Sequence, residues 1–142
     1  MKALLDVNVL IALLDLNHVH HAKAMKWFQN NLNLGWATCP ITENGCIRIL
    51  SQPKYSNQLS ISDAVQRLRT LVASPFYEFV PDGVSLHDSA AVNVSLLSGH
   101  RQLTDVYLLA LAVNHNMRLA TFDGGIPLAP VVGASQSNLV VI

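Results

Sequence analysis

Short apolar runs alternate with longer segments of helical periodicity along this chain. Five of the runs are four or five residues long. Turn or capping residues bound them, which is typical of buried strands. They cover residues 2–6, 36–39, 76–80, 118–122 and 139–142. We therefore expect five strands.

Helices are predicted between these strands. Apolar positions recur with helical spacing over residues 7–16, 22–28, 42–50, 63–73, 86–97 and 105–114. Asn8, Ser62 and Thr104 stand where N-caps are expected. Because short strands alternate with helices, the pattern predicts an α/β fold with a mainly parallel sheet, in one domain that spans residues 1–142.

Four acidic residues stand at the junctions between predicted strands and helices: Asp6, Glu43, Asp105 and Asp123. Asp6 closes the first strand just before the apolar run of residues 9–14. An ionised carboxylate there must lose water, which is costly unless a partner charge, hydrogen bonds or a metal compensates. In parallel α/β sheets the reactive crevice lies beyond the carboxyl ends of the strands. We therefore expect the four acids to meet at one edge of the sheet.

Each acid also has an ordinary structural explanation. Glu43 and Asp105 stand in first helical turns, where the helix dipole favours a negative side chain, and Asp123 before two glycines fits turn chemistry. One acid at every junction nevertheless favours a shared site. Carboxylate oxygens are ligands that Mg²⁺ prefers, and a bound cation activates water against phosphate esters. Asn8, Thr104 and Thr121 are candidates for supporting this site, with capping and strand packing as the alternatives.

The overall charge permits a phosphate substrate without requiring one. Hydrophobic residues make up 51% of the chain and charged residues 13%, as in a core-rich globular protein, and nine Lys and Arg balance nine Asp and Glu. If cations neutralise the four junction acids, nine positive charges remain against five negative ones. A modestly basic surface around a metal-filled acidic pocket would suit phosphate.

Other classes of site lack their signatures. No apolar stretch has the length of a membrane span, and an acid interrupts the first apolar run as no signal peptide would allow, so we expect a cytoplasmic protein. Cys39 and Cys46 form no CxxC motif and are expected to be buried hydrophobes. His18, His20 and His21 lack a second set of zinc ligands, which favours a solvated loop. Neither a nucleophile elbow nor a phosphate-binding glycine loop is present.

The ordered motifs resemble the PIN domain, and more closely the VapC-type toxins of bacterial toxin–antitoxin pairs. The resemblance covers nearly the whole chain. Its main motifs are LLDVNVLI at residues 4–11, TENG at 42–45, LTDVYL at 103–108 and TFD at 121–123, with HVHH at 18–21, WF at 27–28 and WATCP at 36–40 fitting a VapC subgroup.

The resemblance implies a three-layer α/β/α sandwich and an endoribonuclease that depends on Mg²⁺ or Mn²⁺. It also implies a homodimer that a small antitoxin inhibits by occupying the acidic pocket. By position, Asp6 and Asp105 would bind the metal directly, Asp123 would help to hold a second ion, and Glu43 would orient or deprotonate the attacking water. Asn8 stands where the family often has Ser, Thr or Asp.

Two alternatives remain at this point. In a haloacid-dehalogenase-like phosphatase the first strand also ends in an aspartate, but the required second aspartate would stand at Asn8. A non-catalytic domain that binds RNA or a partner protein could keep the same fold. The presence of all four acids argues against a non-catalytic domain. A metal titration with RNA would discriminate between such a domain and a metal-dependent nuclease.

Overall fold

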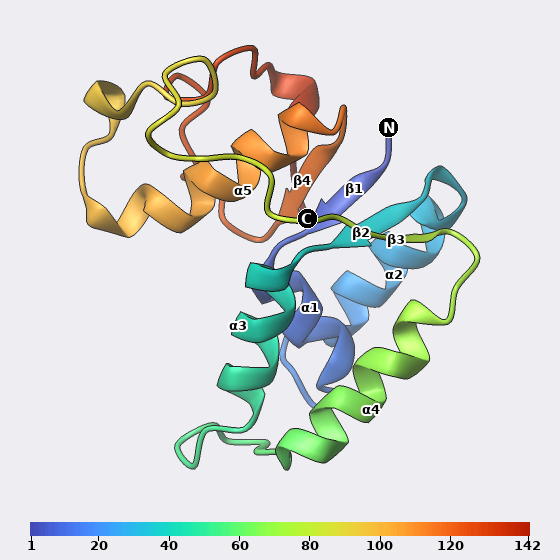
Figure 1. Ribbon diagram of the computed structural model, residues 1–142. Coiled ribbons are helices and arrows are strands. Elements are labelled where there is room, and N and C mark those ends of the chain that lie inside the picture. The colour runs from blue at the N-terminus through green and yellow to red at the C-terminus, as the bar shows by residue number, and fades with distance from the viewer.

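The central sheet of the computed structural model, which describes residues 1–142, contains five strands that all run parallel (Figure 1). Their spatial order is β3-β2-β1-β4-β5, so the first strand of the chain lies in the middle. The strands are β1 (Ala3–Leu5), β2 (Trp36–Thr38), β3 (Tyr77–Phe79), β4 (Arg118–Thr121) and β5 (Leu139–Val141). All five predicted strands are present.

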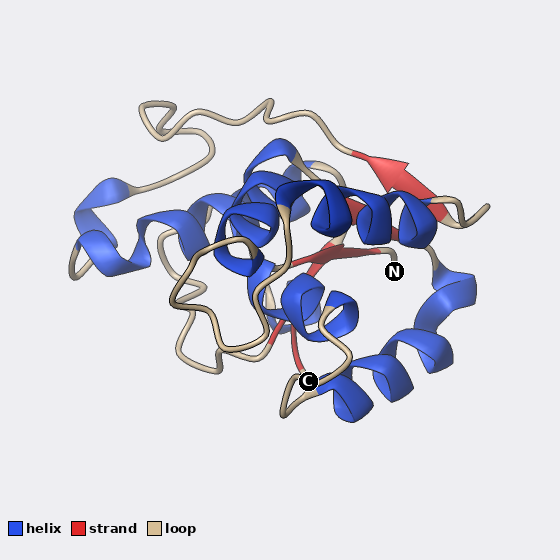
Figure 2. Ribbon diagram, turned by 90° about the horizontal axis from the view of Figure 1, so that it is seen from below, coloured by secondary structure: helices blue, strands red, loops and turns tan.

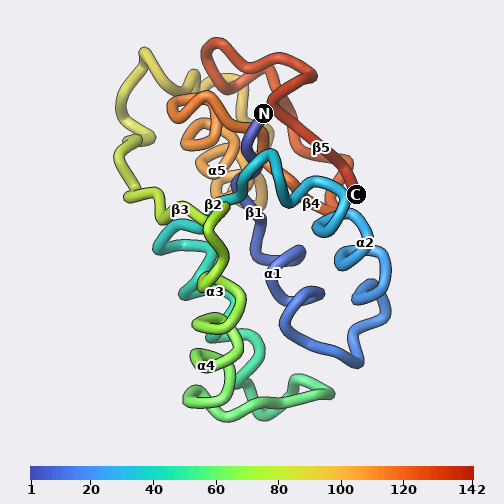
Figure 3. The backbone as a smooth tube through the Cα atoms, turned by 90° about the vertical axis from the view of Figure 1, so that its right-hand side faces the viewer, coloured from blue at the N-terminus to red at the C-terminus, as the bar shows by residue number.

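Helices cover both faces of the sheet, and Figures 2 and 3 show this arrangement from two further directions. Four helices pack on one face: α1 (Val7–Leu14), α2 (His21–Asn31), α3 (Pro40–Leu50) and α4 (Ile61–Val72). The opposite face packs against α5 (Leu103–Asn114). The predicted α/β/α sandwich with a parallel sheet is therefore confirmed.

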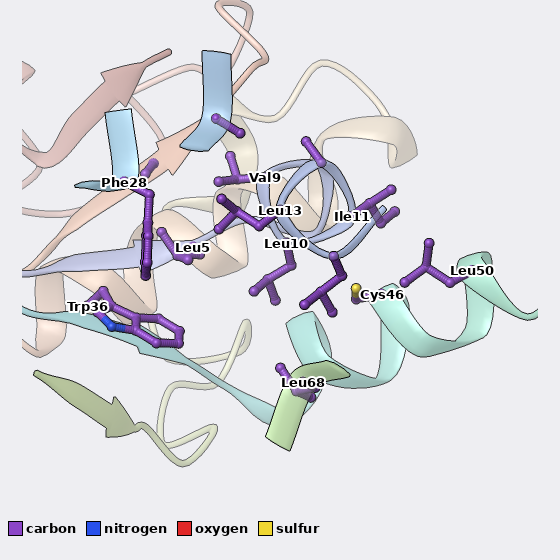
Figure 4. Packing of buried hydrophobic residues seen from close by; sticks show 14 of the residues in the cluster. Leu5, Val9, Leu10, Ile11, Leu13, Phe28, Trp36, Cys46, Leu50 and Leu68 are labelled. Atoms are coloured by element: carbon purple, nitrogen blue, oxygen red, sulfur yellow. The ribbon is translucent and has the colours of Figure 1, made fainter. Parts of the chain in front are cut away.

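Alternating side chains of the strands feed two separate cores. Leu5 and Trp36 pack among α1 to α4, as Figure 4 shows from close by, whereas Leu4 of the same β1 strand packs with α5. This follows from strand geometry, in which successive side chains point to opposite faces. All three residues of β1 are buried, so Asp6, which directly follows them, stands at the end of a buried strand.

One predicted helix is absent. Residues 86–97 form turns and a single 3₁₀ turn at Val94–Leu96, within the irregular yellow segment of Figure 1. Their backbone pairs with a distant loop instead: the Asn93 N–H donates to the Pro130 carbonyl at 2.7 Å, and the Val132 N–H donates to the Ala91 carbonyl at 3.0 Å. The apolar spacing of this segment thus serves packing against residues 130–132, and tertiary pairing overrides helix periodicity.

The three predicted caps were also wrong. Asp6, not Asn8, caps α1 with its side chain, and Ser60, not Ser62, caps α4. Helix α5 begins at Leu103, so Thr104 lies inside its first turn and no side chain caps it. Asn8 and Thr104 are therefore free of the capping role that was their ordinary explanation.

Candidate functional site

Asp6 lies at the carboxyl end of β1, where strand β1 turns into helix α1. Its side chain is only 5% exposed. One carboxylate oxygen accepts the backbone N–H of Val7 at 2.6 Å, and the other accepts the Thr121 hydroxyl at 2.7 Å. Burial raises the pKa of Asp6 above its ordinary value, although both hydrogen bonds act in the opposite direction. The side chain is thus well fixed but poorly compensated as an anion.

Thr121 and Asn8 tie the ends of β1 and β4 together. The Asn8 amide donates to the Thr121 hydroxyl at 3.1 Å, and its carbonyl oxygen accepts the Phe122 N–H at 3.2 Å. Thr121 is fully buried, and its hydroxyl oxygen also accepts the Asp123 N–H at 3.0 Å. These contacts fix the backbone on which Asp6 and Asp123 stand.

Asp105 brings a third carboxylate to the same place from the first turn of α5. The pKa of Asp105 is raised to about 6, first by burial, then by the negative charge of Asp6 and then by that of Asp123. Asp123 likewise contributes to the raised pKa of Asp6. The structure therefore brings these three aspartates together, and we call Asp6, Asp105 and Asp123 the acidic rim.

No basic side chain neutralises the acidic rim. The one ion pair in the structure joins Lys2 to Glu78. The rim offers carboxylate, amide and hydroxyl oxygens, the donor type that hard divalent cations bind. Such a cation would relieve the mutual repulsion of the aspartates, so the donor chemistry fits one. As they stand, no three His, Cys, Asp or Glu side chains form a group that could hold a metal ion.

Glu43, the fourth predicted acid, is held apart from the other three. Its Oε1 accepts the Thr38 hydroxyl at 2.5 Å and the Tyr77 hydroxyl at 3.1 Å, and these two hydroxyls lie 2.9 Å from each other. Glu43 is not among the charges that raise the pKa of Asp6 or Asp105. The predicted convergence thus holds for three acids, and the fourth is fixed over the β2–β3 edge.

The roles of Thr38 and Tyr77 were not anticipated from the sequence. Thr38 ends β2 and is fully buried, and Tyr77 opens β3. Tyr77 is 34 residues from Glu43, so no local pattern links them. A threonine at the carboxyl end of a strand, five residues before an acid in a first helical turn, is the one signal that the sequence offered.

A cleft of about 490 Å³ opens between the start of α1, α3 and the start of α5. Val7, Gly45, Arg48 and Thr104 are among the residues that line it. Gly45 allows the close approach of α3 to α1, because a Cβ atom there would lie 3.0 Å from a methyl group of Val7. Thr104 places this cleft directly beside Asp105, with the exposed cation Arg48 on its wall.

This fold and site agree with a family model described as the PIN domain, which matches residues 3–130. The chain belongs to the PIN-domain family. Within it, this PIN domain is 44% identical to ribonuclease VapC44 of Mycobacterium tuberculosis, with all 142 residues of both chains covered. It is also 46% identical to ribonuclease VapC38 of the same organism over 125 residues, which are 87% of this chain and 86% of the relative. The family relationship inferred from the motifs is confirmed.

Two solved structures share the fold. One is VapC20 of Mycobacterium tuberculosis, a toxin that cleaves the sarcin–ricin loop, with a TM-score of 0.62 and 14% identity over 93% of this chain and 98% of the other. The second is VapBC2 of Rickettsia felis bound to a DNA fragment from its promoter, with a TM-score of 0.59 and 14% identity over 100% and 98% of the two chains. At this identity they support the fold alone. None of the helices of this PIN domain has the length and apolar character needed to cross a membrane.

Proposed function

We propose that this PIN domain is a metal-dependent endoribonuclease and the toxin of a VapBC-type toxin–antitoxin pair. The observation that carries the proposal is the meeting of three aspartates from β1, α5 and β4 with no cationic side chain to balance them. The full-length similarity to proteins named ribonuclease VapC supports RNA as the substrate. We also propose that one functional domain spans residues 1–142. Membership of the PIN family removes the basis for the phosphatase alternative.

In the proposed mechanism the acidic rim would hold Mg²⁺ or Mn²⁺. Such an ion, when bound, supplies charge against the phosphate and lowers the pKa of water. Asp6 and Asp105 would be direct ligands, and Asp123 would complete the set or hold a second ion. Thr121 and Asn8 keep Asp6 and Asp123 in place through their hydrogen bonds. Thr104 would face the substrate from the cleft wall.

Glu43 is proposed as the group that orients or deprotonates the attacking water. Thr38 and Tyr77 both donate to its Oε1, which leaves Oε2 without a hydrogen bond from the protein. The free Oε2 can accept a proton while the two hydrogen bonds to Oε1 fix the side-chain rotamer. The assignment requires Glu43 to act on a water that lies between α3 and the rim, because the carboxylate itself does not join the aspartates.

Two partners belong to the proposal besides RNA. We propose a cognate antitoxin that covers the acidic rim and a second copy of this chain that completes a homodimer. For the antitoxin, a cationic side chain entering the rim would supply the compensating charge that the protein itself lacks.

The deciding experiment compares the wild type with Asp6→Asn, which has the same size without the charge. We expect the wild type to cleave single-stranded RNA with Mg²⁺ or Mn²⁺ and to be inert with EDTA. Asp6→Asn should lose on the order of 100-fold or more in rate while keeping the fold. A wild type that binds RNA with metal but never cleaves it would instead support the non-catalytic alternative.

The toxin assignment has a separate test. Expression of the wild type in a bacterium without an antitoxin should arrest growth, and expression of Asp6→Asn to the same level should not. Equal growth with both proteins would overturn the toxin assignment while leaving the nuclease assignment intact.

A further inference from the structure

A stacked ring pair lies directly beside the acidic rim. The imidazole of His20, in the loop before α2, stacks on the Phe122 ring with 5.0 Å between ring centroids and 27° between ring planes. His20 is exposed and Phe122 is partly buried. The His18 ring lies tilted beside His20, with 5.7 Å between centroids and 47° between planes. The stacked pair thus leaves part of the His20 ring exposed, and its two members stand about a hundred residues apart in sequence.

The backbone of Phe122 is part of the site itself. Its N–H donates to Asn8 Oδ1 at 3.2 Å, and the hydroxyl of the preceding Thr121 donates to Asp6 at 2.7 Å. The next residue is Asp123, the third aspartate of the rim. The backbone from which this ring projects is thus held by the same network of hydrogen bonds that positions Asp6 and Asp123.

Lys23 adds a positive charge to the ring pair. Its Nζ lies 5.9 Å from the centroid of Phe122 and has no acidic partner, since the one ion pair in the structure is Lys2 with Glu78. The chain contains no Asp or Glu from residue 16 to residue 42. The segment that carries His20 and Lys23 therefore contributes cationic side chains and no carboxylate. We call His20, Lys23 and Phe122 the ring ledge.

We infer that the ring ledge binds one nucleotide of single-stranded RNA next to the bond that is cut, with the base stacked on His20 and a phosphate against Lys23. This inference rests on the proposed nuclease function. Base stacking on a side-chain ring is tolerant of sequence, and lysine contacts neutralise phosphates. An acidic peptide would satisfy Lys23 but offers no flat group for the rings. A base-paired strand cannot place its base face there.

The test uses the full chain with the single substitutions His20→Ala and Lys23→Ala. Both side chains are exposed, so the fold should persist. Lys54→Ala is the matched control, because Lys54 is an equally exposed lysine in the loop between α3 and α4. Each variant is assayed for steady-state cleavage of a short single-stranded RNA. The same changes are made in the Asp6→Asn background, where binding of that RNA is measured against salt concentration.

We expect both ledge substitutions to raise KM at least about fivefold and to leave kcat unchanged, because they remove ground-state contacts remote from the reacting atoms. In the binding assay Lys23→Ala should also lower the slope of log Kd against log salt by about 0.7, the value for one phosphate contact on a single strand. His20→Ala should weaken binding without changing that slope. Lys54→Ala should match the wild type in both assays.

The possible results test the ring ledge and the proposed nuclease function separately. If the wild type cleaves RNA and the ledge variants behave like Lys54→Ala, the ledge inference is overturned and the nuclease stands. A fall in kcat at constant KM would also overturn it, because the ledge would then not be a binding surface. If the wild type neither cleaves nor binds RNA, the proposed function itself fails.

Discussion

Helix α1 has a buried aspartate at each end, and the two behave in opposite ways. Asp6 precedes the helix and is 5% exposed, and Asp15 follows it and is 3% exposed. Burial raises the pKa of Asp6 above its ordinary value. Burial acts on Asp15 in the same direction, but hydrogen bonds from Tyr55, Asn57 and the Asn17 N–H outweigh it and hold the pKa of Asp15 below its ordinary value.

Both acids accept hydrogen bonds, but at Asp6 the effect of burial is the larger and the negative charge of Asp123 adds to it. Asp15 accepts the Tyr55 hydroxyl and the Asn57 amide on one oxygen and the Asn17 N–H on the other, so its charge is stabilised by three donors. No other carboxylate raises its pKa. The acidic rim gathers like charges, and Asp15 gathers hydrogen-bond donors. Burial of an acid alone therefore says little about function, whereas burial with unrelieved repulsion indicates a site awaiting a positive ligand.

The largest change in stability is expected when the side chain of Asp15 is removed. Asp15→Ala should lower the free energy of unfolding by about 3 kcal/mol, because it leaves the Tyr55 and Asn57 donors without their acceptor. Cleavage per folded molecule should be unchanged. Urea denaturation and an RNA cleavage assay check the two halves. A loss of activity at full folding would mean that Asp15 belongs to the site.

The pH dependence of Asp15 has a definite sign. A group whose folded pKa is depressed contributes stability that is present above its unfolded pKa and is lost as pH falls through the folded pKa. The stability difference between the wild type and Asp15→Asn should therefore be constant at neutral pH and shrink as pH falls below about 3.8, the ordinary value. Thermal unfolding of both proteins across this range measures it. A difference that grew with acidification would contradict the assignment.

Loss of a charge from the acidic rim should raise the stability of the protein, whereas loss of Asp15 lowers it. Without metal, Asp105→Asn should raise the free energy of unfolding by up to about 1 kcal/mol, a modest figure because water screens the partly exposed carboxylate. Asp63 stands at the equivalent third position of α4, where it faces no rim, and is the matched control. Asp63→Asn should lose a little stability through the helix dipole. Destabilisation by both changes would argue against repulsion at the rim.

The smallest effect on stability is expected at Glu43. Like Asp15, this carboxylate accepts hydrogen bonds from distant side chains, and like the acidic rim it belongs to the proposed site. Tyr77→Phe removes one donor from Glu43 and leaves Thr38 in place, so stability should fall by less than about 1 kcal/mol. We expect kcat to fall severalfold with KM unchanged. Tyr55→Phe, which removes the corresponding donor from Asp15, should lower stability more and leave kcat intact. Equal kcat values for both variants would remove Glu43 orientation from the mechanism.

Residues at strand ends were the most predictable part of the molecule. Short apolar runs located all five strands, and the acids after β1 and β4 meet because parallel strands place their carboxyl ends at one edge. Asp105 joins them from the first turn of α5, which no strand directly precedes. Each cap was missed by two residues, since a second polar residue stands two positions away at each helix start. The expected helix over 86–97 failed because its partner, residues 130–132, lies far along the chain.

Asp15 and the cradle of Glu43 could not be predicted for the same reason. Tyr55 lies 40 residues from Asp15, and Tyr77 lies 34 residues from Glu43. Asp15 also stands within an apolar stretch between Leu14 and Leu16, where it shows none of the junction pattern that marks the rim. Hydrogen bonds between such distant side chains depend on the finished fold and leave no periodicity in the sequence.

The place of β1 at the centre of the sheet has a consequence during translation. The ribosome makes Asp6 115 residues before Thr121, whose hydroxyl donates a hydrogen bond to it. At ordinary elongation rates of 5–20 residues per second this interval is roughly 6 to 23 seconds. Until β4 leaves the exit tunnel, the nascent chain has neither the central strand pair nor Asp123. A fragment released by a ribosome that stalls before Thr121 therefore lacks both the donor that fixes Asp6 and the third aspartate of the acidic rim.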